Sequence, residues 1–492
     1  MSELPLRRAL TVILCSGLVA RCFPSTPGVE GVHGTSPAPG AFWTPPAGND
    51  TTKTETAPPN VPPDLAARVN NLGLSDVLDV ALRNNTATSA SWYTARAAAE
   101  TYGAAKGAYY PTLALNGTFN AVKTVPSIDS GRGSIEEKYY GPTLTLNWLL
   151  FDFGGRSGAI GEAREGLLAA DWTHNATVQA VVLTVEQAYF QYLGTKALLT
   201  AQQTTLQEAQ TNLQAAEQRH NVGLATIADV LQARTVVSQA LLAVQSTTGQ
   251  LATTRGALAL SMGLPANVPY DVSVPTDTTI PAGITDSVDT LIDRAVRDRP
   301  DLQAARANAR AAEARISQAR SLALPSLELG GNAGQTFYTI PVSGSAYTAT
   351  LTLHIPLFAG WSDIYRTKAA SATANAARTQ TSGLEQEVVY QVFSSYYGLK
   401  TATQQVQTSA DLVASAQQSA EVALGRYRAG AGALVDLLIA QAALASARAQ
   451  RIQARFSWYV ALAQLAHDVG VLDLHGTSSL HLAADSSKGS PR

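Results

Sequence analysis

The sequence predicts a mainly α-helical protein made of two tandem repeats, each combining a β-hairpin with long coiled-coil helices. Three observations carry this prediction. The body of the chain is one unit written twice. Each unit holds two segments in which apolar and polar residues alternate, the period of a strand. Each unit then continues in a long proline-free stretch with apolar residues seven positions apart, the period of a coiled coil.

The duplication can be followed residue by residue. The run Tyr110–Leu113 recurs 214 positions later as Leu324–Leu327, and Leu150–Gly154 recurs 207 positions later as Leu357–Trp361. The separation therefore falls from 214 to 207 between the two runs. Length changes collect in surface loops, so we expect a longer loop between the two strands of the first repeat.

The N-terminus is typical of an export signal. Two arginines precede an apolar run from Ala9 to Ala20, which is too short to span a bilayer. Cys15 and Cys22 are the only cysteines, so the body of the chain has no internal disulfide and no cysteine-based zinc site. Cys22 is a candidate lipidation site after signal cleavage; the alternative is that it lies beside an ordinary cleavage site.

Ten of the 23 prolines fall in residues 23–65, a composition that buries too little apolar surface to order itself. No uninterrupted apolar run of about 18 residues follows the signal, so any membrane contact would come from a β-barrel. The expected boundaries are a signal peptide at 1–22, a proline-rich disordered linker at 23–71, the first repeat at 72–270, an inter-repeat linker at 271–288, the second repeat at 289–470 and a disordered tail at 471–492.

The alternating segments predict strands at 112–122 and 140–150 in the first repeat and at 326–336 and 346–357 in the second. About ten residues suffice for a tilted strand to cross a bilayer. Four strands cannot close a barrel, and an open edge in lipid leaves backbone groups unsatisfied. The chain must therefore oligomerise if these strands span a membrane, and three copies would supply twelve strands.

The long helical stretches cover about 156–220 and 363–428, and each could extend roughly 100 Å at the rise of an α-helix. Both end at a glycine-bearing turn, and returning helices follow at about 226–262 and 433–469. Three copies would place twelve helical strands in a ring with a hollow centre. The heptad positions are Val178, Val185, Tyr192, Leu199, Leu206 and Leu213, answered by Val392, Leu399, Val406, Val413 and Ala420.

The charge balance disfavours several classes of function. Lys and Arg number 35 against 37 Asp and Glu, so no basic surface for nucleic acid is expected. The seven histidines are scattered without the helical spacing of a metal pair, and no motif gathers serine, histidine and aspartate. We therefore expect neither an enzyme nor a cofactor.

Together these features resemble the TolC-type outer-membrane efflux protein family, including its OprM-like outer-membrane factors, over roughly residues 72–470. The duplication, the Phe-x-x-Gly element after the first hairpin at Phe151 and the paired glycine turns carry the resemblance. It implies a homotrimer whose 12-stranded β-barrel lies in outer-membrane lipid and continues as a 12-helix periplasmic α-barrel. Such a trimer is the exit duct of a tripartite efflux or type I secretion system, with a periplasmic adaptor (membrane fusion) protein and an inner-membrane transporter as partners.

The resemblance also implies a periplasmic gate where the helices converge. Asp229, Tyr427 and Asp436 match gate positions of the family. The sequence departs from the family where Gly432 replaces an arginine and Ile439 replaces a further aspartate. Three copies would bring six aspartates to the mouth, which favours cations.

A purely structural interpretation of these residues is also open. Thr226 and Asp229 have the spacing of a capping box, and Asp436 lies in the first turn of its helix, where the helix dipole favours a carboxylate. Arg219 and Arg426 fit helix C-terminal cations better than pore residues.

The turns are the expected docking surface for the adaptor. A rival function is a trimeric coiled-coil stalk or adhesin at the cell surface, which would need the alternating hairpin once or not at all. The tip residues are Val222, Gly223, Leu224, Ala429 and Gly430.

Overall fold

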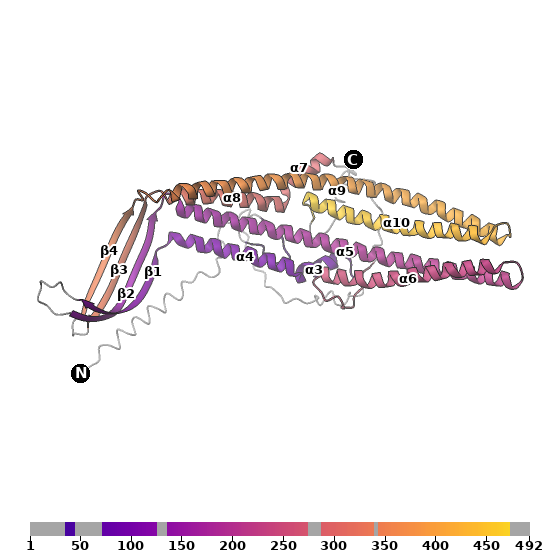
Figure 1. Ribbon diagram of the computed structural model, residues 1–492, viewed down its shortest axis with the longest axis horizontal. Helices are drawn as coiled ribbons and strands as arrows, with labels where there is room; N and C mark the ends of the chain where they lie inside the picture. The colour runs from indigo at the N-terminus through magenta and orange to yellow at the C-terminus, as the bar shows by residue number, and fades with distance from the viewer. Residues whose placement is uncertain (1–34, 45–70, 125–134, 274–286, 339–342, 473–492) are drawn as a thin grey trace, which may run out of the picture.

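The computed structural model describes residues 35–44, 71–124, 135–273, 287–338 and 343–472. Within them the molecule is elongated, with a β-sheet at one end and long antiparallel helices running to the other (Figure 1). The signal segment with Cys22 and the loop between the strands of the first repeat lie outside the described residues. The predicted mainly helical architecture with two repeats is confirmed.

The two repeats have the same elements in the same order. The first repeat consists of α3 (Leu74–Asn84), α4 (Thr86–Lys106), the short 3-10 helix η1 (Gly107–Tyr109), β1 (Thr112–Thr124), β2 (Ile135–Phe151), α5 (Gly155–Asn221) and α6 (Ile227–Ser261). The second consists of α7 (Val288–Asp298), α8 (Pro300–Ser321), β3 (Ser326–Tyr338), β4 (Ser343–His354), α9 (Ser362–Arg428) and α10 (Leu434–Val469). Strand β2 begins five residues before the expected position 140, and β4 ends three residues before the expected 357.

The four strands form one antiparallel sheet in the order β1-β2-β3-β4. The register places Leu115 opposite Leu144 and Leu329 opposite Leu351, so apolar side chains line up on one face across all four strands. Threonine, asparagine and glycine line the other face. The apolar face is exposed, and β1 and β4 are open edges among the described residues.

The junction between sheet and helix is built differently in the two repeats. Both long helices start after two consecutive left-handed residues, which are Phe153 and Gly154 before α5. In the first repeat the Asp152 carboxylate accepts the backbone N–H of Arg156 at 2.6 Å, and the Arg156 side chain donates to the carbonyls of Leu149 and Leu150. The second repeat has Ala359 in place of the aspartate, so it lacks the hydrogen bond that this carboxylate accepts.

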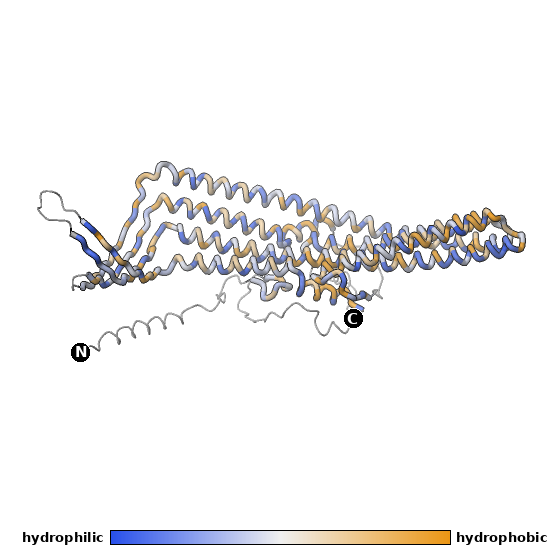
Figure 2. Tube along the Cα trace, turned by 60° about the horizontal axis from the view of Figure 1, so that its bottom comes forward, coloured by the Kyte–Doolittle hydropathy of each residue, from blue (hydrophilic) through white to orange (hydrophobic). Residues whose placement is uncertain are grey.

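Two apolar cores lie midway along the helices. One joins α3, α5 and α6 around Tyr189, and the other joins α7, α9 and α10 around Leu465. The expected heptad residues Val178, Val185 and Tyr192 are buried in the first core. Those nearer the tip of α5, which are Leu199, Leu206 and Leu213, are only half-buried. Figure 2 shows apolar and polar residues interleaved along the long helices.

Residues 35–44 depart from the expectation of a disordered linker over 23–71. Trp43 is buried. The Asn175 side chain forms two hydrogen bonds with the Trp43 backbone: it accepts from the Trp43 N–H at 2.6 Å and donates to the Trp43 carbonyl at 2.7 Å. The Trp92 indole donates to the Ser36 carbonyl at 2.7 Å. The composition argument fails here because one aromatic anchor and a few backbone partners order a short segment without much apolar area. The start of the expected tail differs too, since Leu472 is buried.

Helix α6 is the one helix among the described residues that is long and apolar enough to cross a membrane by length and composition. It instead packs antiparallel against α5 (Figure 1). Several of its apolar side chains, including Leu241 and Leu242, are exposed.

Replacing Gly263 with alanine should destabilise the protein by about 2–3 kcal/mol. Gly263 ends α6 with φ +73°, and an added Cβ would lie 2.6 Å from the Asn84 carbonyl oxygen. Gly223 is the matched control, because its φ of +75° is similar but nothing lies within 4 Å of an added Cβ. Urea unfolding should show a clearly larger loss for Gly263→Ala than for Gly223→Ala; equal losses would show that the contact with Asn84 is unimportant.

Candidate functional site at the helical tips

The candidate site lies at the end of the molecule farthest from the sheet, where α5 turns into α6 and α9 turns into α10 (Figure 1). Gly223 and Gly430 stand just past the ends of the long helices with φ of +75° and +74°. The Leu224 N–H donates to the Arg219 carbonyl at 2.8 Å, and the second turn repeats this bond. A left-handed glycine with this bond is a standard way to end a helix.

The predicted docking residues are all at the surface of these turns. Val222 and Leu224 are about 70% exposed, which is unusual for two apolar side chains side by side. Gly223, Ala429 and Gly430 are exposed as well. The turns therefore present a small, mostly apolar surface, with the exposed Arg428 beside the second turn.

Asp229 forms a capping box at the start of α6. Its carboxylate accepts the backbone N–H of Thr226 at 2.9 Å and the hydroxyl of Thr226 at 2.8 Å. Its own N–H donates to the same hydroxyl oxygen at 3.2 Å. The carboxylate is thus oriented by the helix start, as the structural interpretation of the spacing expected.

Asp436 is in a different situation, although it occupies the equivalent position in α10. Ala433 stands where Thr226 caps α6, so no side chain caps this helix. Asp436 is exposed and makes no hydrogen bond or ion pair with any described residue. Its carboxylate lies in the first turn of α10, where the helix dipole favours a negative charge.

Tyr427 lies buried in an apolar cluster that joins all four long helices at the tips. Leu434, Leu437 and Leu438 from α10 contribute to this cluster, which we call the tip cluster. The hydroxyl of Tyr427 is buried with no hydrogen-bond partner among the described residues. The other members are Ala216, Val230 and Ala233, with Leu213, Val236, Ala423 and Leu424 packed around them.

An arginine does meet Tyr427, but from the other repeat. The Arg219 guanidinium lies 4.6 Å from the centre of the Tyr427 ring, and its Nη1 donates to the Tyr427 carbonyl at 2.9 Å. Arg219 lies in the last turn of its own helix, as the sequence predicted, and its side chain also caps the end of α9. At Gly432 an added Cβ would crowd Arg426 at 3.1 Å. The recurrence of arginine at 219 and 426 was the signal that could have revealed this contact.

Between the tips and the middle of the helices, polar side chains connect the helices of the two repeats. Arg448 on α10 pairs with Glu208 on α5 at 3.1 Å, and Asn212 donates to Gln441 at 2.5 Å. Both contacts cross from one repeat to the other. They hold α10 against α5 between the core and the tips.

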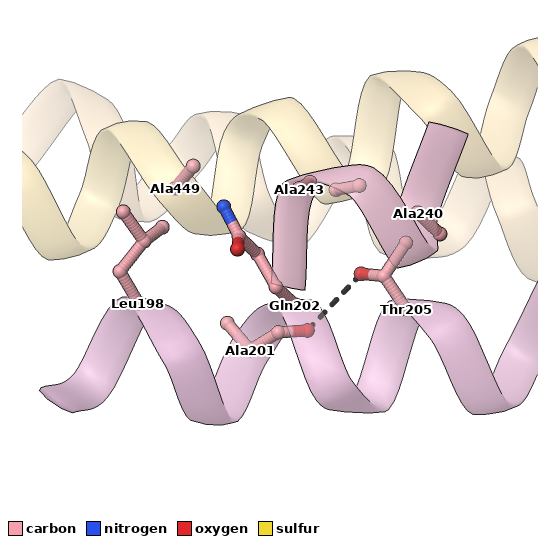
Figure 3. Close-up of a pocket in the computed structure, with 8 residues that line it drawn as sticks. Leu198, Ala201, Gln202, Thr205, Ala240, Ala243 and Ala449 are labelled. Carbon is pink, nitrogen blue, oxygen red and sulfur yellow. Dashed lines mark hydrogen bonds between the residues drawn. The ribbon is translucent and has the colours of Figure 1, made fainter. Parts of the chain in front are cut away.

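A groove of about 170 Å³ lies between α5, α6 and α10 (Figure 3). Its walls are mainly alanine methyl groups, with Gln202 and Thr205 as the polar members. Small side chains let the three helices approach closely, so this groove is a packing feature. The described residues contain no group of three or more His, Cys, Asp or Glu that could hold a metal ion.

Comparisons with known protein sequences match both repeats of the chain. The family model for outer membrane efflux proteins matches residues 77–264 and 291–471, one match per repeat. The chain is 28% identical over 396 residues to protein CyaE of Bordetella pertussis, covering 79% of this chain and 82% of that protein. It is 26% identical over 362 residues to the probable efflux pump outer membrane protein TtgC of Pseudomonas putida, covering 71% of this chain and 72% of that protein.

Solved structures show the same fold. The outer membrane protein VceC of Vibrio cholerae matches with a TM-score of 0.71 at 20% identity, covering 81% of this chain and 96% of VceC. The outer membrane channel CmeC of Campylobacter jejuni matches with a TM-score of 0.73 at 17% identity, covering 91% of this chain and 98% of CmeC. With each repeat matched separately and the fold shared along the molecule, this chain belongs to the outer membrane efflux protein family, the TolC-type channels of the outer membrane.

Proposed function

We propose that three copies of the chain form the exit duct of a tripartite efflux or type I secretion system. In this proposal the duct passively conducts substrates from an inner-membrane transporter and a periplasmic adaptor to the exterior. The observation that carries it is the separation of two surfaces. An open sheet with an exposed apolar face lies at one end, and a closed, apolar cluster of four helices lies at the other (Figure 1).

The properties of the sheet support its proposed role as the membrane end of the duct. Its apolar face includes Phe119 and Tyr347, which are strongly exposed, and its opposite face carries threonine and asparagine. A barrel in lipid needs apolar residues outside and tolerates polar residues in a water-filled lumen. The two open edges supply the pairing groups that copies of the chain would need to close a 12-stranded barrel.

The contacts at the helical tips support the proposal that the gate lies there. Closure in this proposal depends on the tip cluster and on the contact between Arg219 and Tyr427, which replaces the polar lock that Gly432 and Ile439 lack. Asp436 adds a free carboxylate in each copy, while Asp229 contributes through the helix start it caps. The exposed Val222 and Leu224 offer an adaptor an apolar contact that none of the described residues covers. A stalk or adhesin would need neither a tip cluster nor these surfaces.

Conductance across planar bilayers tests the duct and its charge. We expect wild-type trimers to conduct with a preference for cations. Asp436→Asn should lower the ratio of cation to anion permeability by roughly two- to tenfold, because it removes the free carboxylates from a narrow mouth. Asp229→Asn is the matched control: it removes the charge but keeps an oxygen able to cap α6, so it separates charge from helix capping.

The outcomes are distinct. Reconstituted trimers that never conduct, even as Asp436→Ala, would rule out a duct. Conduction with unchanged ion preference in both variants would leave the duct in place and reduce the aspartates to structural roles.

A further inference from the structure

A groove between α5 of the first repeat and α10 of the second is lined mainly by apolar and aromatic side chains. Phe190 of α5 stacks on Tyr459 of α10 with ring centres 4.8 Å apart, and the Phe456 ring lies 6.3 Å from the same tyrosine. Leu193 and Ile452 add to the apolar walls, and the groove has a volume of about 150 Å³. An apolar cavity of about this volume holds one benzene-sized ring.

Two arginines of α10 also line this groove, and neither has an anionic partner among the described residues. Arg455 is half-buried, and its Nε is fully buried without a hydrogen-bond acceptor among those residues. Arg451 lies four positions earlier, on the same face of the helix, and is exposed. An unsatisfied buried donor costs free energy, and like charges four positions apart on a helix repel each other. Both costs would fall if an anion entered the groove.

The stretches of α5 and α10 that form the groove supply no carboxylate to neutralise these arginines. Residues 187–207 and 437–467 contain neither aspartate nor glutamate. Arg448, by contrast, reaches beyond this stretch and pairs with Glu208 of α5 at 3.1 Å.

The repeated architecture does not explain the two arginines either. Their equivalents on α6, 207 positions earlier, are Val244 and Thr248. The helix of the first repeat therefore folds with two neutral residues at these positions. The arginines are specific to the groove between α5 and α10.

We propose that this groove binds a small aromatic carboxylate. The planar guanidinium of Arg455 would donate two parallel hydrogen bonds to the carboxylate, and Arg451 would add a second, more exposed positive charge. The ring of the ligand would lie against the aromatic side chains, of which Tyr459 is central. The ligand would touch both repeats, because α5 and α10 share the groove. This site lies apart from the tips, and its binding of a ligand does not depend on the proposed duct.

The size and lining of the groove favour this class of ligand over its alternatives. A small anion such as acetate or phosphate would meet the arginines but leave the aromatic walls uncovered, so it would gain little from apolar burial. A neutral ring would fill the groove but leave the buried Nε of Arg455 without a charged acceptor. A long-chain carboxylate would not fit in about 150 Å³.

Calorimetric titration of the purified protein with benzoate tests the proposal. We expect saturable binding with a Kd on the order of 1 mM or below. Benzamide keeps the ring without the charge, and acetate keeps the charge without the ring. Each should bind at least about tenfold more weakly than benzoate, because each loses one half of the recognition. High salt should weaken benzoate binding, since it screens the arginines.

Variants separate the charge from the shape of the groove. Arg455→Gln should weaken benzoate binding by about tenfold or more, and Arg451→Gln by roughly threefold, since its charge is exposed. Ala197→Phe keeps both arginines but fills part of the groove, so it should abolish binding. Arg320→Gln is the matched control: it removes an exposed arginine of α8 outside the groove and should leave the Kd unchanged.

Three results would overturn the site. These are no saturable benzoate binding by the folded wild type, equal affinity for benzoate and acetate, and equal affinity of wild type and a folded Arg455→Gln. If Arg455→Gln fails to fold, Arg451→Gln and the comparison of the three ligands on wild type decide: an unchanged Kd in Arg451→Gln together with equal binding of benzamide would overturn the site. Binding is measured without conduction, so the duct is tested separately.

Discussion

Replacing Asp171 with asparagine should stabilise the protein at alkaline pH and change its stability little at acidic pH. Asp171 lies on α5, fully buried, and neither carboxylate oxygen has a hydrogen-bond partner among the described residues. Burial raises the pKa of this carboxyl from 3.8 to about 8, since the charged form loses its water. The folded protein therefore holds a proton that the unfolded chain releases.

The direction of the pH dependence follows from this difference. Below about pH 4 both states are protonated, and Asp171 has no pH-dependent effect. Between about pH 4 and 8 the unfolded chain ionises first, so the free energy of unfolding falls as pH rises. Above about pH 8 the loss is complete and amounts to roughly 6 kcal/mol.

Urea unfolding of wild type and Asp171→Asn at pH 5 and pH 9 measures this effect. The advantage of the variant should be small at pH 5, where only the first part of the loss has occurred, and much larger at pH 9. Asp411→Asn, at an exposed position on α9, is the control and should show no such difference. Parallel pH profiles for wild type and Asp171→Asn would show that Asp171 is not held protonated.

Replacing Arg219 with alanine should open the periplasmic end of the channel. The variant loses a charged hydrogen bond to the Tyr427 carbonyl and a guanidinium stacked on the Tyr427 ring. Together these contacts are worth about 2 kcal/mol in each copy. A change of that size shifts the balance between joined and separated tips roughly 30-fold per copy. We expect a higher open probability and a larger mean conductance in planar bilayers.

Two further variants sharpen the result. Arg219→Lys keeps the charge but loses the flat guanidinium, so it should fall between wild type and Arg219→Ala. Arg448→Ala removes another arginine that links the repeats, through Glu208, but far from the tips. It should leave the closed channel closed. If Arg219→Ala conducts like wild type, the tip cluster alone holds the channel shut.

Much of the fold was predictable because its signals are local. The matching turns and the offsets of 214 and 207 predicted two equal repeats, and α3 to α6 indeed recur as α7 to α10 at those offsets. Alternation predicted all four strands, and the spacing of Thr226 and Asp229 predicted the capping box. Each of these depends on residues a few positions apart, where backbone geometry alone dictates which side chains share a face.

What only the tertiary structure decided are the contacts between distant residues. Arg219 on Tyr427, Asn175 on the backbone of Trp43 and the burial of Asp171 join or enclose groups whose neighbours come from other elements. Local periodicity places a residue on one face of a helix, but the packing of several helices determines what it meets there. By itself the sequence determined the repeated architecture and the tip region, and the packed helices decided which side chains meet at that site.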